Sequence, residues 1–315
     1  LKQRARDGDV DVLCLSPEYA YSWLSQNRDV ASRVSLLCVD EAHCLLEDGK
    51  SFRPPYVKEV PKIRSELLSP DTPLLGLSAT MSVGDAAQFS TIMGMENAVT
   101  VRGSPDRKDV FIGIRESKSL RTDILRLLSE YDVACESHGG VCQAIGYFAT
   151  KKELKRAMEH WNDASPNKAN AVDGDTPKEE GDLLLAQWLS GEAPVIFATS
   201  AFGMGIDCPT VGLVSQMGMP ASISQMTQYL GRVARGRSMV GMYVCVWRTS
   251  DTKIQATLNS GVSPEEGTQR WEQLSKVRAA LSGGGCIRDT LVEHFGCIAS
   301  KPKPLFSFKG YEDLR

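Results

Sequence analysis

The chain has 315 residues, enough for two domains with separate cores. Hydrophobic residues make up 42% and charged residues 24%, the usual balance of a globular protein, and the formal net charge is −3. This net charge excludes a protein that is basic over its whole surface. A surface that binds nucleic acid must therefore be a local groove. We find no apolar run that would span a bilayer and no secretory signal, so we expect no membrane partner.

The nine cysteines are odd in number, none forms a CxxC pair, and several lie within apolar segments. This usage indicates reduced core thiols in an intracellular protein. Because the chain begins at Leu1 rather than at a methionine, we expect the natural N-terminus to lie upstream.

Three apolar segments in the first third predict an α/β fold with a parallel sheet. They are residues 10–15, 34–39 and 73–77. Ser16 and Pro17 follow the first segment and suit the N-cap and first turn of a helix. Polar residues follow the other two, and ligands of parallel sheets bind beyond the carboxyl ends of the strands.

A charged, turn-rich stretch at residues 102–109 predicts a domain boundary. The predicted elements that follow are a strand at 143–148, a helix at 150–161, a polar loop at 162–175, a helix opened by a Thr176 capping box and ended by Gly191, and strands at 195–199, 211–215 and 242–247. Two helices are expected at 265–281 and 286–295. The predicted domains are therefore residues 1–106, 107–250 and 251–315, the last a short helical tail.

Asp40 and Glu41 stand at the end of the second predicted strand. Beside a nucleotide, one carboxylate of such a pair holds Mg²⁺, usually through water, and the other orients the water that attacks the γ-phosphate. We assign the first role to Asp40 and the second to Glu41. The alternative is a solvated turn after the strand.

Ser78 and Thr80 stand at the end of the third predicted strand. Their hydroxyls suit hydrogen bonds to the carboxylates or to His43. Such bonds would transmit the state of the bound nucleotide to a bound nucleic-acid strand. The alternative is an N-cap for the next helix.

Residues 198–207, ATSAFGMGID, combine a strand end with glycines that allow close approach of a ligand, Gly205 among them. Thr199 suits a contact with a phosphate, and Asp207 suits ribose hydroxyls. The alternative is an ordinary turn after a strand.

Arg232 and Arg235 are three residues apart, which predicts that they share one helix face. Two guanidiniums aimed together suit a triphosphate, as an arginine finger does. The alternative is a pair of surface salt bridges.

The order of these four patterns resembles that of the superfamily 2 helicases, and of the RecQ family within them. Residues 15–18, 39–43, 78–80, 198–207 and 228–235 are similar to motifs Ib, II, III, V and VI. The RecQ likeness depends on Ala42-His43-Cys44 leading to Phe52-Arg53-Pro54, on the AFGMGI form at 201–206, and on Cys286-Ile-Arg-Asp with His294-Phe-Gly296.

The resemblance implies two RecA-like lobes of the P-loop NTPase type, the first truncated here, that clamp ATP. It implies ATP and Mg²⁺ as cofactors, 3′-to-5′ movement, single-stranded or forked DNA as partner, and work in repair or recombination. A nuclear location follows if the source is eukaryotic, and otherwise the cytoplasm or nucleoid. By residue, it implies that Asp40, Glu41, His43, Arg232 and Arg235 are catalytic.

For the remaining site residues, nucleotide binding is expected of Gln228, Gly205, Asp207, Ser78 and Thr80, and nucleic-acid binding of Phe52, Arg53, Thr199 and Ser16. The sequence also departs from the family. No G-x-x-x-x-G-K followed by Ser or Thr occurs, so as given the chain should bind ATP poorly. Asp48 stands where the family has Trp, and Tyr229 where it has an acidic residue.

Four zinc ligands cannot be assembled around Cys286 and Cys297, so no zinc site is assigned. Two other functions stay open: a DEAD/DEAH-type RNA helicase, and a catalytically inactive relic that binds nucleic acid.

Overall fold

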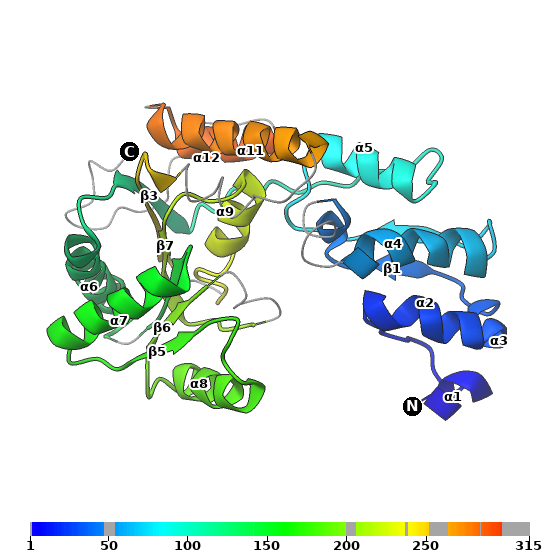
Figure 1. The fold of residues 1–315 in the computed structure, drawn as a ribbon, viewed down its shortest axis with the longest axis horizontal. Helices are drawn as coiled ribbons and strands as arrows, with labels where there is room; N and C mark the ends of the chain where they lie inside the picture. The colour runs from blue at the N-terminus through cyan, green and yellow to red at the C-terminus, as the bar shows by residue number, and fades with distance from the viewer. Residues whose placement is uncertain are drawn as a thin grey trace. The chain divides into compact units, whose positions relative to one another are not determined.

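The computed structural model describes residues 2–46, 54–140, 142–199, 206–236, 239–251, 264–283 and 285–297. The chain forms two compact units (Figure 1). The first comprises Leu1–Ser104 with His294–Gly296, and the second contains Pro105–Glu293.

The first unit is built on a small parallel sheet. Its elements are α1 (Lys2–Asp7), α2 (Pro17–Gln26), α3 (Arg28–Ala31), β1 (Leu37–Val39), η1 (Ala42–Leu45), α4 (Pro54–Lys62), η2 (Ile63–Leu67), β2 (Leu74–Gly76) and α5 (Val83–Ile92). Strand β1 pairs with β2 in parallel, with Cys38 opposite Leu75. The predicted parallel pairing is confirmed, although both strands are shorter than expected.

The strand expected at residues 10–15 is wrong. These residues take part in no strand pairing, and Leu13 and Leu15 instead pack against the buried cluster that contains Trp23 and Leu24. Val12 and Cys14 of the same segment are exposed. The helix expected after Ser16 is present as α2, with Ser16 at its N-cap but without a side-chain capping bond.

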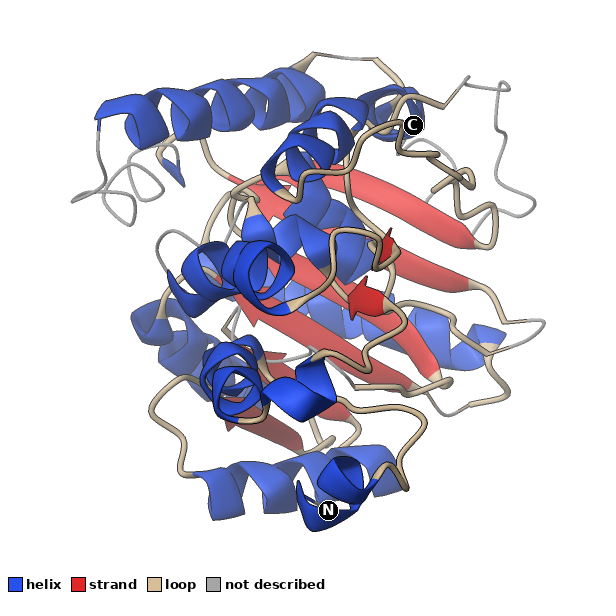
Figure 2. Cartoon of the chain, turned by 90° about the vertical axis from the view of Figure 1, so that its right-hand side faces the viewer, coloured by secondary structure: helices blue, strands red, loops and turns tan. Residues whose placement is uncertain are grey.

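The second unit is a six-stranded, all-parallel sheet in the order β3-β8-β7-β4-β6-β5, with its strands red in Figure 2. Its elements are β3 (Val110–Glu116), α6 (Leu120–Ser137), β4 (Gln143–Phe148), α7 (Lys151–Ala164), β5 (Ala169–Val172), α8 (Lys178–Ser190), β6 (Val195–Ala198), β7 (Val211–Met217), α9 (Ile223–Leu230), β8 (Gly241–Trp247), α11 (Pro264–Ser282) and α12 (Ile287–His294). The predicted α/β class is confirmed.

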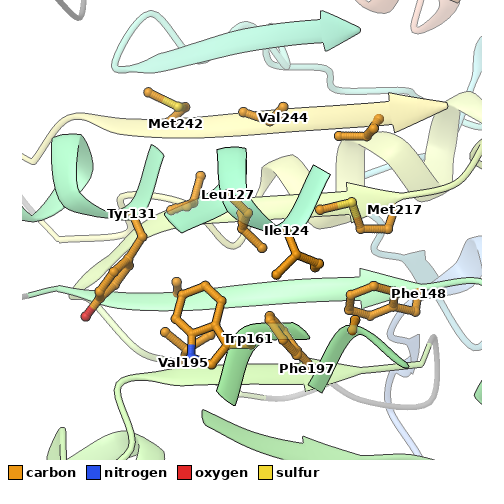
Figure 3. Packing of buried hydrophobic residues seen from close by; sticks show 14 of the residues in the cluster. Ile124, Leu127, Tyr131, Phe148, Trp161, Val195, Phe197, Met217, Met242 and Val244 are labelled. Atoms are coloured by element: carbon orange, nitrogen blue, oxygen red, sulfur yellow. The ribbon is translucent and has the colours of Figure 1, made fainter. Parts of the chain in front are cut away.

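The main core of this unit lies between the sheet and helices α6 and α7. Figure 3 shows Ile124 and Leu127 of α6 and Trp161 of α7 directed at the strands. Trp161 is fully buried, and its ring meets the Phe197 ring edge-on with 5.5 Å between centroids. Burial of these large rings supplies much of the driving force for docking the two helices.

Several predictions in the second unit need correction. Strand β5 lies within the segment expected to be a polar loop, and β3 and α6 were not predicted. The Thr176 capping box is wrong, because the Thr176 hydroxyl accepts the Asp173 N–H at 3.0 Å and Pro177 holds the N-cap position. Gly191 does end α8, in a left-handed conformation with φ +80°. None of the described helices is long and apolar enough to cross a bilayer.

Candidate functional site

A tight turn after β1 carries Asp40 and Glu41, and both side chains are exposed. Glu41 has φ 48°, a left-handed conformation uncommon outside glycine, and its N–H donates to Asp40 Oδ1 at 2.9 Å. The turn is tied to the end of β2, since the Ala42 N–H donates to the Leu77 carbonyl at 2.8 Å. The carboxylates therefore lie at the edge of the sheet where both strands end.

His43 connects this turn to the end of β2. It is 4% exposed, and its Nδ1 lies 3.0 Å from Ser78 Oγ and 3.3 Å from Glu41 Oε2. Ser78 Oγ also accepts the Thr80 N–H at 3.2 Å. The structure thus brings together Glu41, His43, Ser78 and Thr80, with Asp40 next in the chain.

The residues at this turn fit Mg²⁺ better than a metal held entirely by protein. Asp40 offers an exposed carboxylate, and Mg²⁺ commonly takes one or two carboxylates and completes its octahedron with water and phosphate oxygens. Within the described ranges, no three His, Cys, Asp or Glu side chains gather as a metal site. Cys286 is exposed and Cys297 is half-buried.

Arg232 and Arg235 come together in the second unit, but the helix-face prediction is wrong. Helix α9 ends at Leu230, and the chain turns through Ala234, whose φ is +49°. Both guanidiniums nevertheless reach the Ile206 carbonyl, at 3.1 Å from Arg232 and 3.2 Å from Arg235. Arg235 also lies 3.4 Å from Asp207 Oδ1. The turn, rather than a helical repeat, makes the two side chains converge.

Arg107 supports this turn and was missed by the sequence reasoning. Its Nη2 donates to the Val233 and Ala234 carbonyls at 3.0 and 2.8 Å. The same guanidinium binds the Asp109 carboxylate through two nitrogens, and this hydrogen bonding holds the pKa of Asp109 below its usual value. The sequence places Arg107 only within the charged stretch at residues 102–109 that predicts a domain boundary.

Tyr229, which stands in the family's acidic position, stacks on Tyr147 of β4. The ring centroids are 3.8 Å apart and the planes differ by 4°. Both tyrosines line a pocket of about 180 Å³ near the ends of β4 and β7. The Tyr147 hydroxyl is buried and has no hydrogen-bond partner among the described residues. Burial raises the pKa of Tyr147 to about 12, and the charges of Arg232 and Arg235 oppose that rise.

The other expected site residues are more dispersed. Ser16 is exposed at the start of α2, Thr199 is half-buried after β6, and Gln228 is half-buried on α9. Phe52, Arg53 and Gly205 lie outside the described residues.

Comparison with known proteins finds two helicase families. The DEAD/DEAH box helicase family matches residues 1–89, and the helicase conserved C-terminal domain matches residues 123–237. The ATP-dependent helicase wrn-1 of Caenorhabditis elegans is 28% identical over 297 residues, which cover 93% of this chain and 28% of wrn-1. The ATP-dependent helicase SGS1 of Saccharomyces cerevisiae is 26% identical over 303 residues, which cover 92% of this chain and 20% of SGS1. The chain thus spans under a third of either relative.

Solved structures share the fold at lower identity. Helicase Lhr of Mycobacterium smegmatis, bound to ssDNA and AMP-PNP, has a TM-score of 0.55 and 18% identity over 84% of this chain and 36% of Lhr. Dbp5 of S. cerevisiae, bound to RNA and ADP BeF3, has a TM-score of 0.57 and 17% identity over 83% of this chain and 68% of that chain. Together with the motif residues placed above, the two family matches and the curated relatives support the resemblance: the chain is similar to superfamily 2 helicases and, over most of its length, to helicases of RecQ type.

Proposed function

We propose that this chain works in an ATP-dependent DNA helicase of RecQ type, which couples ATP hydrolysis to 3′-to-5′ movement along single-stranded DNA and unwinds forked DNA. The observation that carries the proposal is the position of His43, whose Nδ1 lies within 3.3 Å of both Glu41 Oε2 and Ser78 Oγ, within a chain that is RecQ-like over most of its length. His43 connects the Glu41 carboxylate at the end of β1 to Ser78 at the end of β2. Through this contact, hydrolysis of the nucleotide can change the position of residues that bind a nucleic-acid strand.

The first unit supplies the hydrolytic residues in this proposal. Asp40 holds Mg²⁺, which neutralises phosphate charge when bound, and Glu41 orients the attacking water. His43 fixes the Glu41 side chain while it contacts Ser78, and Ser78 in turn accepts the Thr80 N–H.

The second unit supplies the positive charge. Arg235 stabilises the charge that develops on the transferred phosphoryl group, with Arg232 and Gln228 beside it. Asp207 orients Arg235 through their ion pair and offers its exposed carboxylate to the ribose hydroxyls. Gly205 allows the backbone to approach the nucleotide closely.

Nucleic-acid contacts complete the proposal. Thr199 and Ser16 donate hydroxyls to phosphates, and Phe52 and Arg53 provide an aromatic and a cationic contact to the strand. Work in DNA repair and recombination, and a nuclear location in a eukaryote, extend the proposal from the RecQ-like relatives.

RNA is the second candidate substrate, because one relative, R290 of Acanthamoeba polyphaga mimivirus, is named as an RNA helicase and is 25% identical over 264 residues. Fluorescence anisotropy with labelled single strands of one sequence, as DNA and as RNA, separates the two. We expect tighter binding to DNA that weakens as salt rises, since phosphate contacts release counterions. Tighter binding to RNA would overturn the DNA assignment.

Turnover tests the residue roles in a version of the protein that carries the ATP-phosphate loop. Glu41→Gln and Arg235→Ala should each lower DNA-stimulated ATP hydrolysis by about 10³-fold or more. Arg278→Ala, at an exposed position on α11, is the matched control and should retain full activity. Full activity in the Glu41 and Arg235 variants would contradict the assigned roles.

A further inference from the structure

Two thiols lie in contact at the amino end of β4. Cys135 is in the last turn of α6, and Cys142 directly precedes β4. Their Sγ atoms are 3.3 Å apart, and both cysteines are free. Neither residue belongs to the groups that the proposed helicase function uses.

Hydrogen bonds hold the backbone on both sides of this pair. The His138 and Gly140 N–H groups donate to the Cys135 carbonyl at 2.9 and 2.8 Å. The Tyr131 hydroxyl donates to the Cys142 carbonyl at 3.1 Å. The fold therefore sets the separation of the two sulfurs, which are 3.3 Å apart, whereas a disulfide bond is about 2 Å long.

The two thiols differ in access and in acidity. Cys135 is half-buried, whereas Cys142 is 1% exposed, so a small oxidant reaches Cys135 first. Hydrogen bonding from the Cys142 thiol lowers the pKa of Cys135, while the same contact raises the pKa of Cys142. Cys135 is thus the better nucleophile, because the thiolate is the reactive form.

We propose that Cys135 and Cys142 form a reversible intramolecular disulfide when the protein meets hydrogen peroxide. The Cys135 sulfur attacks one peroxide oxygen, the O–O bond breaks, and Cys135 sulfenic acid and water result. The Cys142 sulfur then attacks the Cys135 sulfur, an S–S bond forms, and the hydroxyl group leaves as a second water. Two thiols are oxidised and one peroxide is reduced, and a dithiol reductant reverses the change.

The bond would join the end of α6 to the start of β4 within the second unit. Closing this loop restricts the unfolded chain, so oxidation should raise the melting temperature of the second unit by about 5 °C. Tyr147 lies toward the opposite end of β4, so the proposed disulfide leaves the Tyr147–Tyr229 pocket in place.

A digest tests the proposal directly. The chain has no Lys or Arg between Arg126 and Lys151, so trypsin releases both cysteines in the single peptide 127–151. The intact chain is treated with peroxide, alkylated, digested without reductant and analysed by mass spectrometry. We expect this peptide to lose two hydrogens and to carry no alkyl group, and dithiothreitol should restore two alkylation sites.

The exposed thiols Cys14, Cys38 and Cys286 are internal controls in the same digest. If peroxide modifies them while peptide 127–151 still carries two alkyl groups, the proposal is overturned.

Substitution separates the two steps. In Cys142→Ser, the sulfenic acid of Cys135 has no thiol to attack it, so a dione probe such as dimedone should label Cys135. The wild-type chain should resist the probe, and so should Cys208→Ser, which changes a buried thiol that contacts Thr210 instead. Equal labelling of Cys135 in wild type and Cys142→Ser would also overturn the proposal.

Discussion

Two buried tyrosines of the large sheet differ in one hydrogen bond. The Tyr147 hydroxyl has no partner among the described residues, whereas the Tyr243 hydroxyl donates to Gln216 Oε1 at 2.5 Å. Burying a hydroxyl without a partner costs free energy, and a satisfied one recovers it. Tyr147→Phe should therefore raise the free energy of unfolding by about 1 kcal/mol, as measured by urea denaturation.

Tyr243→Phe is the matched comparison, because both rings are almost fully buried in the same sheet. It should lower the free energy of unfolding by about 1 kcal/mol, since Gln216 loses its donor. If Tyr147→Phe destabilised the protein as much as Tyr243→Phe, the Tyr147 hydroxyl would have to be satisfied in solution.

The Arg107–Asp109 pair makes the arginine turn sensitive to acid. The pKa of Asp109 is lowered, first by its hydrogen bonds to Arg107. Its contribution to stability is therefore present above the unfolded pKa and is lost as the pH falls through the folded pKa. Because the Asp109 side chain is 38% exposed, solvent screening limits this contribution to less than about 1 kcal/mol.

Asp109→Asn should lower the free energy of unfolding at neutral pH and flatten its decline between about pH 5 and about pH 2. Chemical denaturation across that range measures both effects. Asp163→Asn, an exposed change on α7, should leave the pH profile unchanged. An unaltered profile in Asp109→Asn would show that the pair does not contribute.

The sequence alone identified Asp40, Glu41, Arg232 and Arg235 as candidate site residues. They stand in motifs that follow one another in the order typical of superfamily 2 helicases. It missed Arg107, whose partners are the carbonyls of Val233 and Ala234, 126 and 127 residues away. It also missed Tyr147, which is near Tyr229 only through the stacking of α9 on the sheet. Contacts that a fold creates at long range leave no local pattern in a sequence.

At the scale of elements, periodicity and turn residues predicted β4, α7, β6, β7, β8 and α11 within a few residues. Strand β5 was missed because its residues Ala169–Val172 are only half-buried at the sheet edge, so they show no apolar run. The reverse error occurred at residues 10–15, which are apolar without a neighbouring strand. An apolar segment does not form a strand by itself, because the partner strand with which it pairs comes from the tertiary fold.

Helix α12 is fixed to the second unit by Arg288, which is 6% exposed. Its guanidinium bonds to Asp106 Oδ1 at 2.8 Å, to the Arg107 carbonyl at 2.9 Å and to the Val110 carbonyl. Arg288→Met should lower the free energy of unfolding by about 3–5 kcal/mol, because the buried Asp106 carboxylate loses its guanidinium partner. Urea denaturation of the variant measures this loss.

Arg278→Met is the control on α11, at an exposed position with equal loss of charge, and should change stability by less than about 0.5 kcal/mol. Adding Asp106→Asn to Arg288→Met should recover part of the loss, since the buried charge is then removed. Additive losses in the double variant would argue against coupling of the two residues.

At the scale of the whole molecule, the two units have unequal sheets. The described part of the first unit pairs only the three-residue strands β1 and β2, and Leu75 and Leu77 are 42% and 44% exposed. In the second unit, β4 and β7 are buried along their whole length and each pairs on both sides. Two-stranded sheets are marginal, whereas fully paired central strands open only with global unfolding.

Hydrogen exchange followed by mass spectrometry should therefore show two levels of protection. We expect amides of β1 and β2 to exchange at least about tenfold faster than those of β4 and β7, because they open without unfolding the larger sheet. Arg288→Met should raise exchange in β3, because the carbonyl of its first residue, Val110, accepts a hydrogen bond from Arg288, and it should leave the rates in β1 and β2 unchanged. Equal rates in all four strands would mean that both units unfold in one cooperative step, and the weak sheet would then draw its stability from the strong one.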